Sequence, residues 1–123
     1  MFRIIKDYIA QAGDVTRNDG SGGDSIYNGK FNDEKPGLSI PIKPNHIVMA
    51  NSGKNSNTSQ FFFVLPKADP ARLAKLVYGK HVVFGEVVSG FDVLEMMSCV
   101  GSESGAIAGG EGVQVWIANC GVL

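Results

Sequence analysis

Four scattered side chains are of the types that bind the backbone of an extended peptide. The Arg3 guanidinium is always charged and presents a planar fork of donors. Three amide side chains, which can both donate and accept hydrogen bonds, belong to Gln11, Asn51 and Gln60. Aromatic and apolar residues that could wall a shallow pocket beside them are Tyr8, Ile9, Phe62 and His81. This set favours peptide binding over the breaking of covalent bonds.

The same residues are also compatible with a fold that has no such site. Arg3 lies between Phe2 and the pair Ile4–Ile5, and an arginine at an alternate position of an amphipathic strand usually faces solvent. The run of three phenylalanines at 61–63 is typical of a core strand. The residue types alone leave both interpretations open.

Patterns for a nucleophilic or metal-dependent hydrolase are missing from the sequence. The loop before Gly20 lacks the regularly spaced Asp or Asn ligands of an EF-hand. The stretch "SGKNS" (52–56) lacks the spacing of a phosphate-binding loop. The two histidines, His46 and His81, do not have metal-ligand spacing. We therefore expect no metal and no cofactor.

The composition fits a single globular domain over residues 1–123. Hydrophobic residues make up 44% of the chain and charged residues 19%, a balance that argues against disorder. The formal net charge of −1, without a block of like charges, argues against a nucleic-acid partner. Neither a membrane span nor a secretory signal is recognisable, so we expect a cytoplasmic protein that binds no membrane. Cys99 and Cys120 are then expected to be reduced.

Apolar patterning predicts a mainly β fold with short helices. Strands are expected at 2–5, 8–12, 46–51, 60–65, 81–88 and 113–120. Helices are expected at 68–77, with Asp69 as N-cap and Pro70 in the first turn, and at 90–99. The Gly- and Asp-rich segment 13–37 is expected to be a long ordered loop. These strands fall short of the about eight that close a barrel, so we expect a sheet with open edges.

Several blocks of the sequence carry a family resemblance. They read "FRII…Q.GD.TR.DG.GG.SIY", "MAN.G.N.N.SQFF", "GKHVVFGEV..G.DV" and "ANCG", in this order along the chain. From residue 2 to residue 121 the chain resembles the cyclophilin family of peptidyl-prolyl isomerases. The resemblance implies a β-barrel with short helices that accelerates rotation about X–Pro bonds. Such chemistry requires neither a nucleophile nor a cofactor.

The resemblance also implies roles for individual residues. Arg3 corresponds to the catalytic arginine, while Gln11 and Asn51 would bind the amide and carbonyl groups of the peptide, Asn51 largely through its backbone. The implied proline pocket comprises Tyr8, Ile9, Phe62, Val77 and His81. Residues that would border the groove are Ala50, Ser52 and Gln60, with Gly20 on the neighbouring wall. The implied substrates are proline-containing peptides and unfolded proteins, and the implied state is a monomer.

The chain departs from the family pattern in the pocket and in the groove. Tyrosine occupies one aromatic pocket position, and Ile9 replaces a more usual methionine. The groove tryptophan that matters for cyclosporin falls on Leu76, inside an insertion at 66–78. The resemblance therefore suggests cyclosporin as a ligand, but the leucine at this position leaves open whether the drug binds.

A further departure is at the start of the sequence. The family domain begins upstream of the segment that contains Arg3, with two strands and a helix. We therefore expect an incomplete, open barrel that lacks the N-terminal two strands and the first helix. Two alternatives to an active isomerase stay open: a non-catalytic module that binds proline peptides, and a truncated fragment that is inactive or does not fold.

Overall fold

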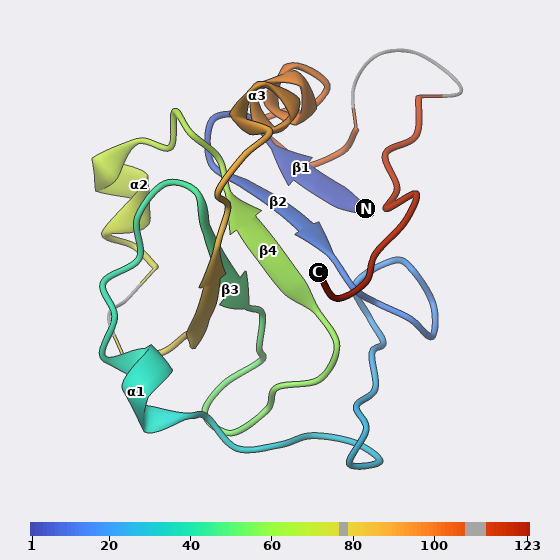
Figure 1. The fold of residues 1–123 in the computed structure, drawn as a ribbon, viewed down its shortest axis with the longest axis vertical. Helices are drawn as coiled ribbons and strands as arrows, with labels where there is room; N and C mark the ends of the chain where they lie inside the picture. The colour runs from blue at the N-terminus through green and yellow to red at the C-terminus, as the bar shows by residue number, and fades with distance from the viewer. Residues whose placement is uncertain (77–78, 108–112) are drawn as a thin grey trace.

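The computed structural model describes residues 1–76, 79–107 and 113–123 (Figure 1). Its strands are β1 (Arg3–Ile5), β2 (Ile9–Ala12), β3 (His46–Met49), β4 (Phe61–Val64) and β5 (Val83–Glu86). Its helices are α1 (Lys35–Leu38), α2 (Pro70–Leu73) and α3 (Phe91–Cys99). The described strands form one antiparallel sheet in the order β1-β2-β4-β3-β5, which does not close on itself. The predicted mainly β class with an open sheet is confirmed.

Five of the predicted strands are present, but the prediction of a strand at 113–120 is wrong. This stretch is irregular, and Trp116 is exposed. The outer edge of β1 is already occupied by residues 102–105, where the backbone N–H of Ile4 donates to the carbonyl of Gly105 at 3.0 Å. Because that edge is occupied, 113–120 finds no partner there for a strand ladder.

Both predicted helices are present, although α2 is shorter than the predicted segment 68–77. Asp69 caps α2 as expected, since its side chain accepts the N–H of Ala71 at 2.9 Å. The helix ends at Leu73, whose carbonyl accepts a short-range bond from the N–H of Leu76. α1 overlaps the end of the expected loop 13–37 and is too short to leave a periodic pattern in the sequence. No helix in the described ranges has the length and apolar character to cross a membrane.

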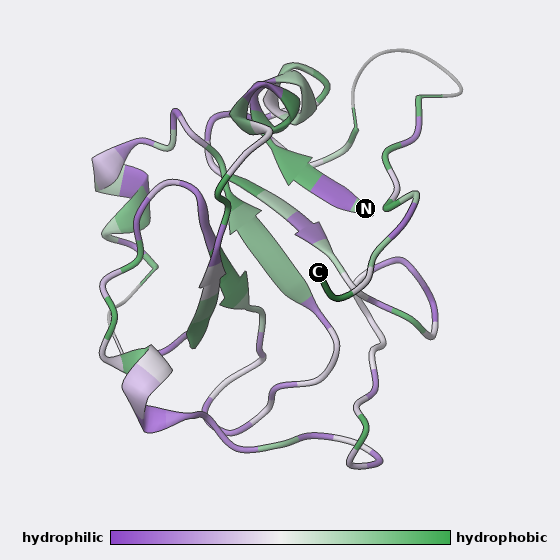
Figure 2. Cartoon of the chain, in the orientation of Figure 1, coloured by the Kyte–Doolittle hydropathy of each residue, from purple (hydrophilic) through white to green (hydrophobic). Residues whose placement is uncertain are grey.

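The two faces of the sheet carry separate apolar clusters. The site face, as we call the one that bears the candidate residues, is built on Ile5, Ile9, Val48, Phe62, Val64, Ala68 and Val83. The reverse face is built on Ile4, Ala10 and Leu65, which pack with Leu94 and Met97 of α3. α3 lies against β1 and β2 (Figure 1), and apolar residues dominate the inner strands (Figure 2). Each strand therefore contributes alternate side chains to two clusters.

The reverse face is covered only in part. Phe61 packs edge-to-face against Phe63 and Phe84, with ring centroids 5.6 and 6.3 Å apart. Phe84 is 54% exposed, and a hollow of about 620 Å³ lies beside Phe61 and Phe84. α3 contacts the β1–β2 end of the sheet, so these aromatic rings remain partly open to solvent.

The turn between β1 and β2 is fixed by a side chain of α3. Asp7 in this turn has a positive φ of 52°, a strained value for a residue other than glycine. The buried Ser98 hydroxyl accepts the backbone N–H of Asp7 and donates to its carboxylate, both at 2.9 Å. The helix thus holds the turn that sets the position of β1 relative to β2.

Candidate active site

Arg3 and Gln11 are cross-strand partners on β1 and β2, so both side chains leave the sheet on the site face. Arg3 is exposed, and its stem lies against Gly105. A Cβ at Gly105 would come within 2.8 Å of Arg3 Cγ. Gly105 also has a φ of +87°, a conformation that favours glycine. This glycine therefore leaves space for the Arg3 stem in the hollow that Arg3 lines together with Gln11.

The amide of Gln11 is oriented by Gln60. Gln11 Nε2 donates to Gln60 Oε1 at 3.0 Å. Gln60 is buried and uses both of its amide protons, donating to the carbonyls of Gly20 at 3.0 Å and Gly22 at 2.7 Å. Gln60 thus acts as a support between the loop and Gln11, while Gln11 Oε1 has no partner among the described residues.

The loop below Gln60 is organised around Asp14, which is 5% exposed. Its carboxylate accepts six hydrogen bonds of 2.9 to 3.2 Å. The donors are the backbone N–H groups of Thr16, Arg17, Asp19, Gly20 and Gly22 and the hydroxyl of Thr16. Desolvation opposes ionisation, but the backbone donors outweigh it and hold the pKa of Asp14 well below its usual range. A charged carboxylate therefore fixes the carbonyls that orient Gln60.

The predicted proline pocket is an apolar cluster with a closed floor. Ile9 and Phe62 are only 6% and 3% exposed. His81 packs edge-to-face against Phe62, with ring centroids 5.8 Å apart. Tyr8 and Leu76 are half-buried against the same cluster. A ligand ring would therefore meet this cluster at its half-buried rim.

Arg72 lies over one side of this rim. Its guanidinium carbon is 5.7 Å from the centroid of the Tyr8 ring, a cation–π distance, and it forms an ion pair with Glu103. Desolvation raises the pKa of Tyr8, although the charges of Arg72 and Arg3 oppose the rise. The Tyr8 hydroxyl is thus protonated at neutral pH and able to donate a hydrogen bond.

The side chain of Asn51 is engaged within the protein. Its Nδ2 donates to the carbonyl of Lys80 at 2.7 Å, and its Oδ1 accepts the N–H of Gly53 at 3.3 Å. Within the described part of the chain, the backbone N–H and carbonyl of Asn51 have no backbone partner. This geometry is compatible with the prediction that Asn51 binds a peptide through its backbone.

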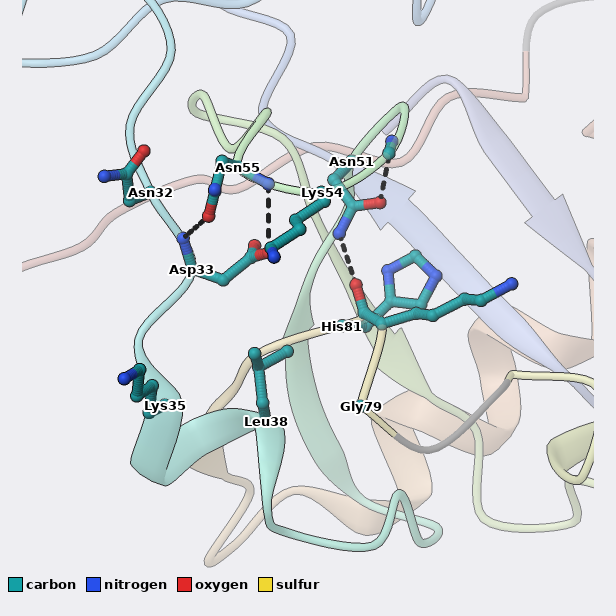
Figure 3. Close-up of a pocket in the computed structure, with 11 residues that line it drawn as sticks. Asn32, Asp33, Lys35, Leu38, Asn51, Lys54, Asn55, Gly79 and His81 are labelled. Atoms are coloured by element: carbon teal, nitrogen blue, oxygen red, sulfur yellow. Dashed lines mark hydrogen bonds between the residues drawn. The ribbon is translucent and has the colours of Figure 1, made fainter.

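Three hollows adjoin one another along the site face. The first, of about 400 Å³, is lined by Arg3, Gln11 and Gly20. The second, of about 270 Å³, shares Gln11 and Gly20 with the first and also includes Asn51. Asn51 is shared in turn with the third, of about 1010 Å³ (Figure 3). We call the third hollow the lysine cleft; the residues used below are Asp33, Lys35, Asn51, Lys54, Lys80 and His81.

The structure brings most of the predicted residues together along this path. Those that line the hollows are Arg3, Gln11, Gly20, Ala50, Asn51, Ser52, Gln60 and His81. Those in or against the apolar cluster are Tyr8, Ile9, Phe62 and Leu76, while Val77 lies outside the described residues. The described ranges contain no group of three or more side chains that could hold a metal ion. The individual roles of these residues remain predictions.

Comparison with known proteins identifies the family. Residues 1–122 match the family described as cyclophilin type peptidyl-prolyl cis-trans isomerase/CLD. The chain belongs to the cyclophilin family. This cyclophilin is 44% identical over 121 residues to a peptidyl-prolyl cis-trans isomerase of Encephalitozoon cuniculi (strain GB-M1). It is 40% identical over 124 residues to the E3 SUMO-protein ligase RanBP2 of Pan troglodytes.

The two relatives differ in how much of their length is matched. Each alignment covers 98% of this cyclophilin, but only 65% of the Encephalitozoon protein and 3% of RanBP2. The cyclophilin thus spans less than two thirds of either relative.

The residues that the sequence predicts for the site do not include Asp14. The signal that could have found it is an aspartate directly before a Gly-, Asn- and Ser-rich loop, because such a loop exposes backbone N–H groups to a nearby acceptor. In this cyclophilin Asp14 does not line any of the three hollows, so it acts on the site through Gly20, Gly22 and Gln60.

Proposed function

We propose that this cyclophilin accelerates the cis–trans isomerisation of X–Pro bonds in extended peptides and unfolded protein chains. The observation that carries the proposal is the pairing of Arg3 with Gln11 across β1 and β2. It puts a charged donor and an amide in one hollow, and the cross-strand pair Ile5 and Ile9 of the apolar cluster lies next on the same face of these two strands. No covalent intermediate and no cofactor are needed.

The chemistry follows from the electronic structure of the amide bond. Resonance holds the X–Pro bond planar and gives rotation a barrier of about 18–20 kcal/mol. In the twisted state the proline nitrogen regains a lone pair that can accept a hydrogen bond. A guanidinium that donates to this nitrogen stabilises the twisted state more than either planar state, which lowers the barrier. Arg3 would supply that donor.

Other residues would hold the peptide while the bond turns. The proline ring would rest on the rim of the apolar cluster near His81. The Asn51 backbone, which has no backbone partner among the described residues, and the Gln11 amide oxygen, which stays free while Nε2 donates to Gln60, would bind the peptide backbone beside it. One side of the bond would then be fixed while the other rotates.

The test is exchange spectroscopy by NMR on a peptide with a single X–Pro bond. Free peptides interconvert in tens to hundreds of seconds, so exchange peaks between cis and trans signals on a subsecond scale require catalysis. We expect such peaks with the wild-type chain and a loss of at least about tenfold in rate in Arg3→Ala, since tenfold corresponds to about 1.4 kcal/mol. Arg3→Lys should recover little activity because lysine lacks the planar fork.

The control for the loss of a cation is Lys43→Ala. Lys43 is exposed and lines none of the three hollows, so the exchange peaks should keep their intensity. Wild-type protein with a dispersed amide spectrum but no exchange peaks would refute the isomerase proposal.

A second candidate is a module that binds proline peptides without catalysis. It is favoured by the burial of Ile9 and Phe62, since a closed floor could hold the ring too shallowly for Arg3 to reach the proline nitrogen. In that case, titrating the same peptide with the protein would shift the peptide NMR signals, but no exchange peaks would connect the cis and trans signals.

We also infer that this cyclophilin binds cyclosporin only weakly. Leu76 is half-buried against the apolar cluster and has no indole N–H to donate. Leu76→Trp should therefore raise the affinity for the drug in a fluorescence titration.

We infer a reducing compartment such as the cytoplasm. Cys99 and Cys120 are both free thiols, which supports a reducing compartment.

A further inference from the structure

We propose that the lysine cleft selects proline peptides that carry an acidic side chain near the proline. The proposal rests on the function above and adds a substrate class to it. The ligand would be an Asp or Glu carboxylate within the same extended peptide whose X–Pro bond is isomerised.

The positive charges of the cleft come from three separate segments. Lys35 begins α1, Lys54 lies in the loop between β3 and β4, and Lys80 precedes β5. All three are exposed. Ion pairs in the described part of the chain involve other residues, so none of these ammonium groups has a carboxylate partner there.

Among the described residues that line the cleft, the one acidic side chain is already engaged. Asp33 accepts the backbone N–H of Asn55 at 2.9 Å and the side-chain Nδ2 of Asn57 at 2.8 Å, the former drawn in Figure 3. Counting three lysines against this aspartate leaves an excess of two positive charges at the cleft. The whole chain has a formal net charge of −1, so the cleft is opposite in sign to the molecule.

Like charges that line one hollow repel each other and raise the local concentration of anions. The screening length at 0.1 M salt is about 10 Å, so each lysine within that distance of a group bound in the cleft contributes to its attraction. A carboxylate bound there would relieve their mutual repulsion. This is an arrangement that an acidic ligand would stabilise.

The cleft is continuous with the proposed site. His81, which packs on Phe62 of the apolar cluster, also lines the cleft, as does Asn51. The bond from Asn51 Nδ2 to the carbonyl of Lys80 ties the lysine-bearing loop to the groove. An extended peptide rises about 3.3 Å per residue, so a side chain about three residues from the proline would reach roughly 10 Å along this path.

The test uses four matched peptides with one X–Pro bond each. They carry Glu or Gln either three residues before or three residues after the proline. The readout is the ratio of enzyme-dependent exchange rates, Glu peptide over Gln peptide, measured below saturation. On one of the two sides we expect a ratio of about threefold or more at low salt, because one exposed charge pair changes affinity by up to about fivefold and three lysines line the cleft. The ratio should fall in 0.5 M salt.

The triple variant Lys35→Gln, Lys54→Gln, Lys80→Gln should bring the ratio close to one. The single variants Lys54→Gln and Lys80→Gln should each lower it in part, and they serve if the triple variant lacks a dispersed amide spectrum. The matched control, Lys43→Gln, removes an exposed lysine outside the cleft and should keep the wild-type ratio.

The outcomes separate this proposal from the isomerase proposal. A wild-type ratio near one on both sides, or a ratio that the triple variant retains, overturns the selection of acidic peptides even if every peptide is isomerised. If no peptide is isomerised, the proposal is decided by the dissociation constants of the four peptides, measured by NMR titration. Tighter binding of a Glu peptide that depends on the three lysines supports the cleft, and equal binding overturns it.

Discussion

Arg3 and Gln11 face each other across two strands, but different neighbours fix their positions. The Arg3 stem lies along Gly105 and has no ion pair in the described part of the chain. Gln11 is held through Gln60 and the loop beneath it. Changing either support should therefore affect the proposed catalysis while Arg3 and Gln11 themselves stay unchanged.

The support of Arg3 can be tested with Gly105→Ala. The added Cβ would lie 2.8 Å from Arg3 Cγ, so the guanidinium must move, and we expect the exchange rate to fall several-fold. The positive φ should also cost about 1–2 kcal/mol of stability. Gly90→Ala is the matched control, because Gly90 has a similar φ of +79° with nothing within 4 Å of a Cβ. It should lose stability but keep its exchange rate; equal losses of rate in both variants would contradict the role of Gly105.

The support of Gln11 can be tested with Asp14→Asn. An amide has one acceptor oxygen instead of two, so several loop N–H groups lose their partner. The unfolding temperature at pH 7 should fall. The exchange rate should fall as well, because the carbonyls of Gly20 and Gly22 would no longer orient Gln60.

The same variant has a pH signature. The folded pKa of Asp14 lies below its ordinary value of 3.8, so the carboxylate stabilises the fold above that pH and this contribution is lost as the pH falls below it. Unfolding curves from pH 5 to pH 2 should show a steep loss of stability in wild type and a flatter one in Asp14→Asn. Asp19→Asn removes a carboxylate charge in the same loop but keeps the one oxygen, Oδ1, that accepts both bonds to Asp19, so it should flatten the curve less. An unchanged slope in Asp14→Asn would contradict this assignment.

At the scale of the elements, α3 controls the geometry of β1 through a single serine. Ser98→Ala would leave the N–H and the carboxylate of Asp7 without their shared partner, which should cost about 1–3 kcal/mol. Urea denaturation measures this loss. Ser89→Ala, at an exposed position just before α3, should change stability by less than about 0.5 kcal/mol. A loss in Ser89→Ala as large as in Ser98→Ala would argue against the turn contact.

The elements that the sequence predicted correctly are those with local signals. β1 and β2 follow from alternation around a two-residue turn, and α2 begins where Asp69 and Pro70 predict. The strand predicted at 113–120 has the right alternation too. The stretch lies beside the start of β1, where Met1 donates to the Val115 carbonyl, but residues 102–105 already occupy that edge of the sheet. No local pattern contains that information.

The site was predictable to a different degree from the fold. Alternation placed Arg3 on an exposed strand position, and only the family resemblance distinguished it from an ordinary surface arginine. The orientation of Gln60 depends on its bonds to the carbonyls of Gly20 and Gly22, which are 40 and 38 positions away in the sequence. Such contacts become visible only when the loop is folded over the sheet.

At the scale of the whole molecule, the two faces of the sheet differ in their exposure to water. The site face presents a polar path, whereas the reverse face leaves Phe84 half-exposed beside a hollow of about 620 Å³. Exposed apolar surface of this kind binds hydrophobic dyes. Phe84→Ser should reduce dye fluorescence relative to wild type while the exchange rate stays unchanged. Ile40→Ser, which removes another exposed apolar side chain that does not line this hollow, should have a smaller effect on the dye.

The saturation of Gln60 has a consequence for how tolerant the groove is. Since both amide protons of Gln60 are committed to glycine carbonyls, this wall of the second hollow has no Gln60 donor with which to tell one peptide side chain from another. The hollow can then accept side chains according to their bulk and remain indifferent to their hydrogen-bonding groups. Such a cyclophilin would accept many unrelated client sequences at the second hollow. It would select among them only through side chains towards the ends of the bound segment.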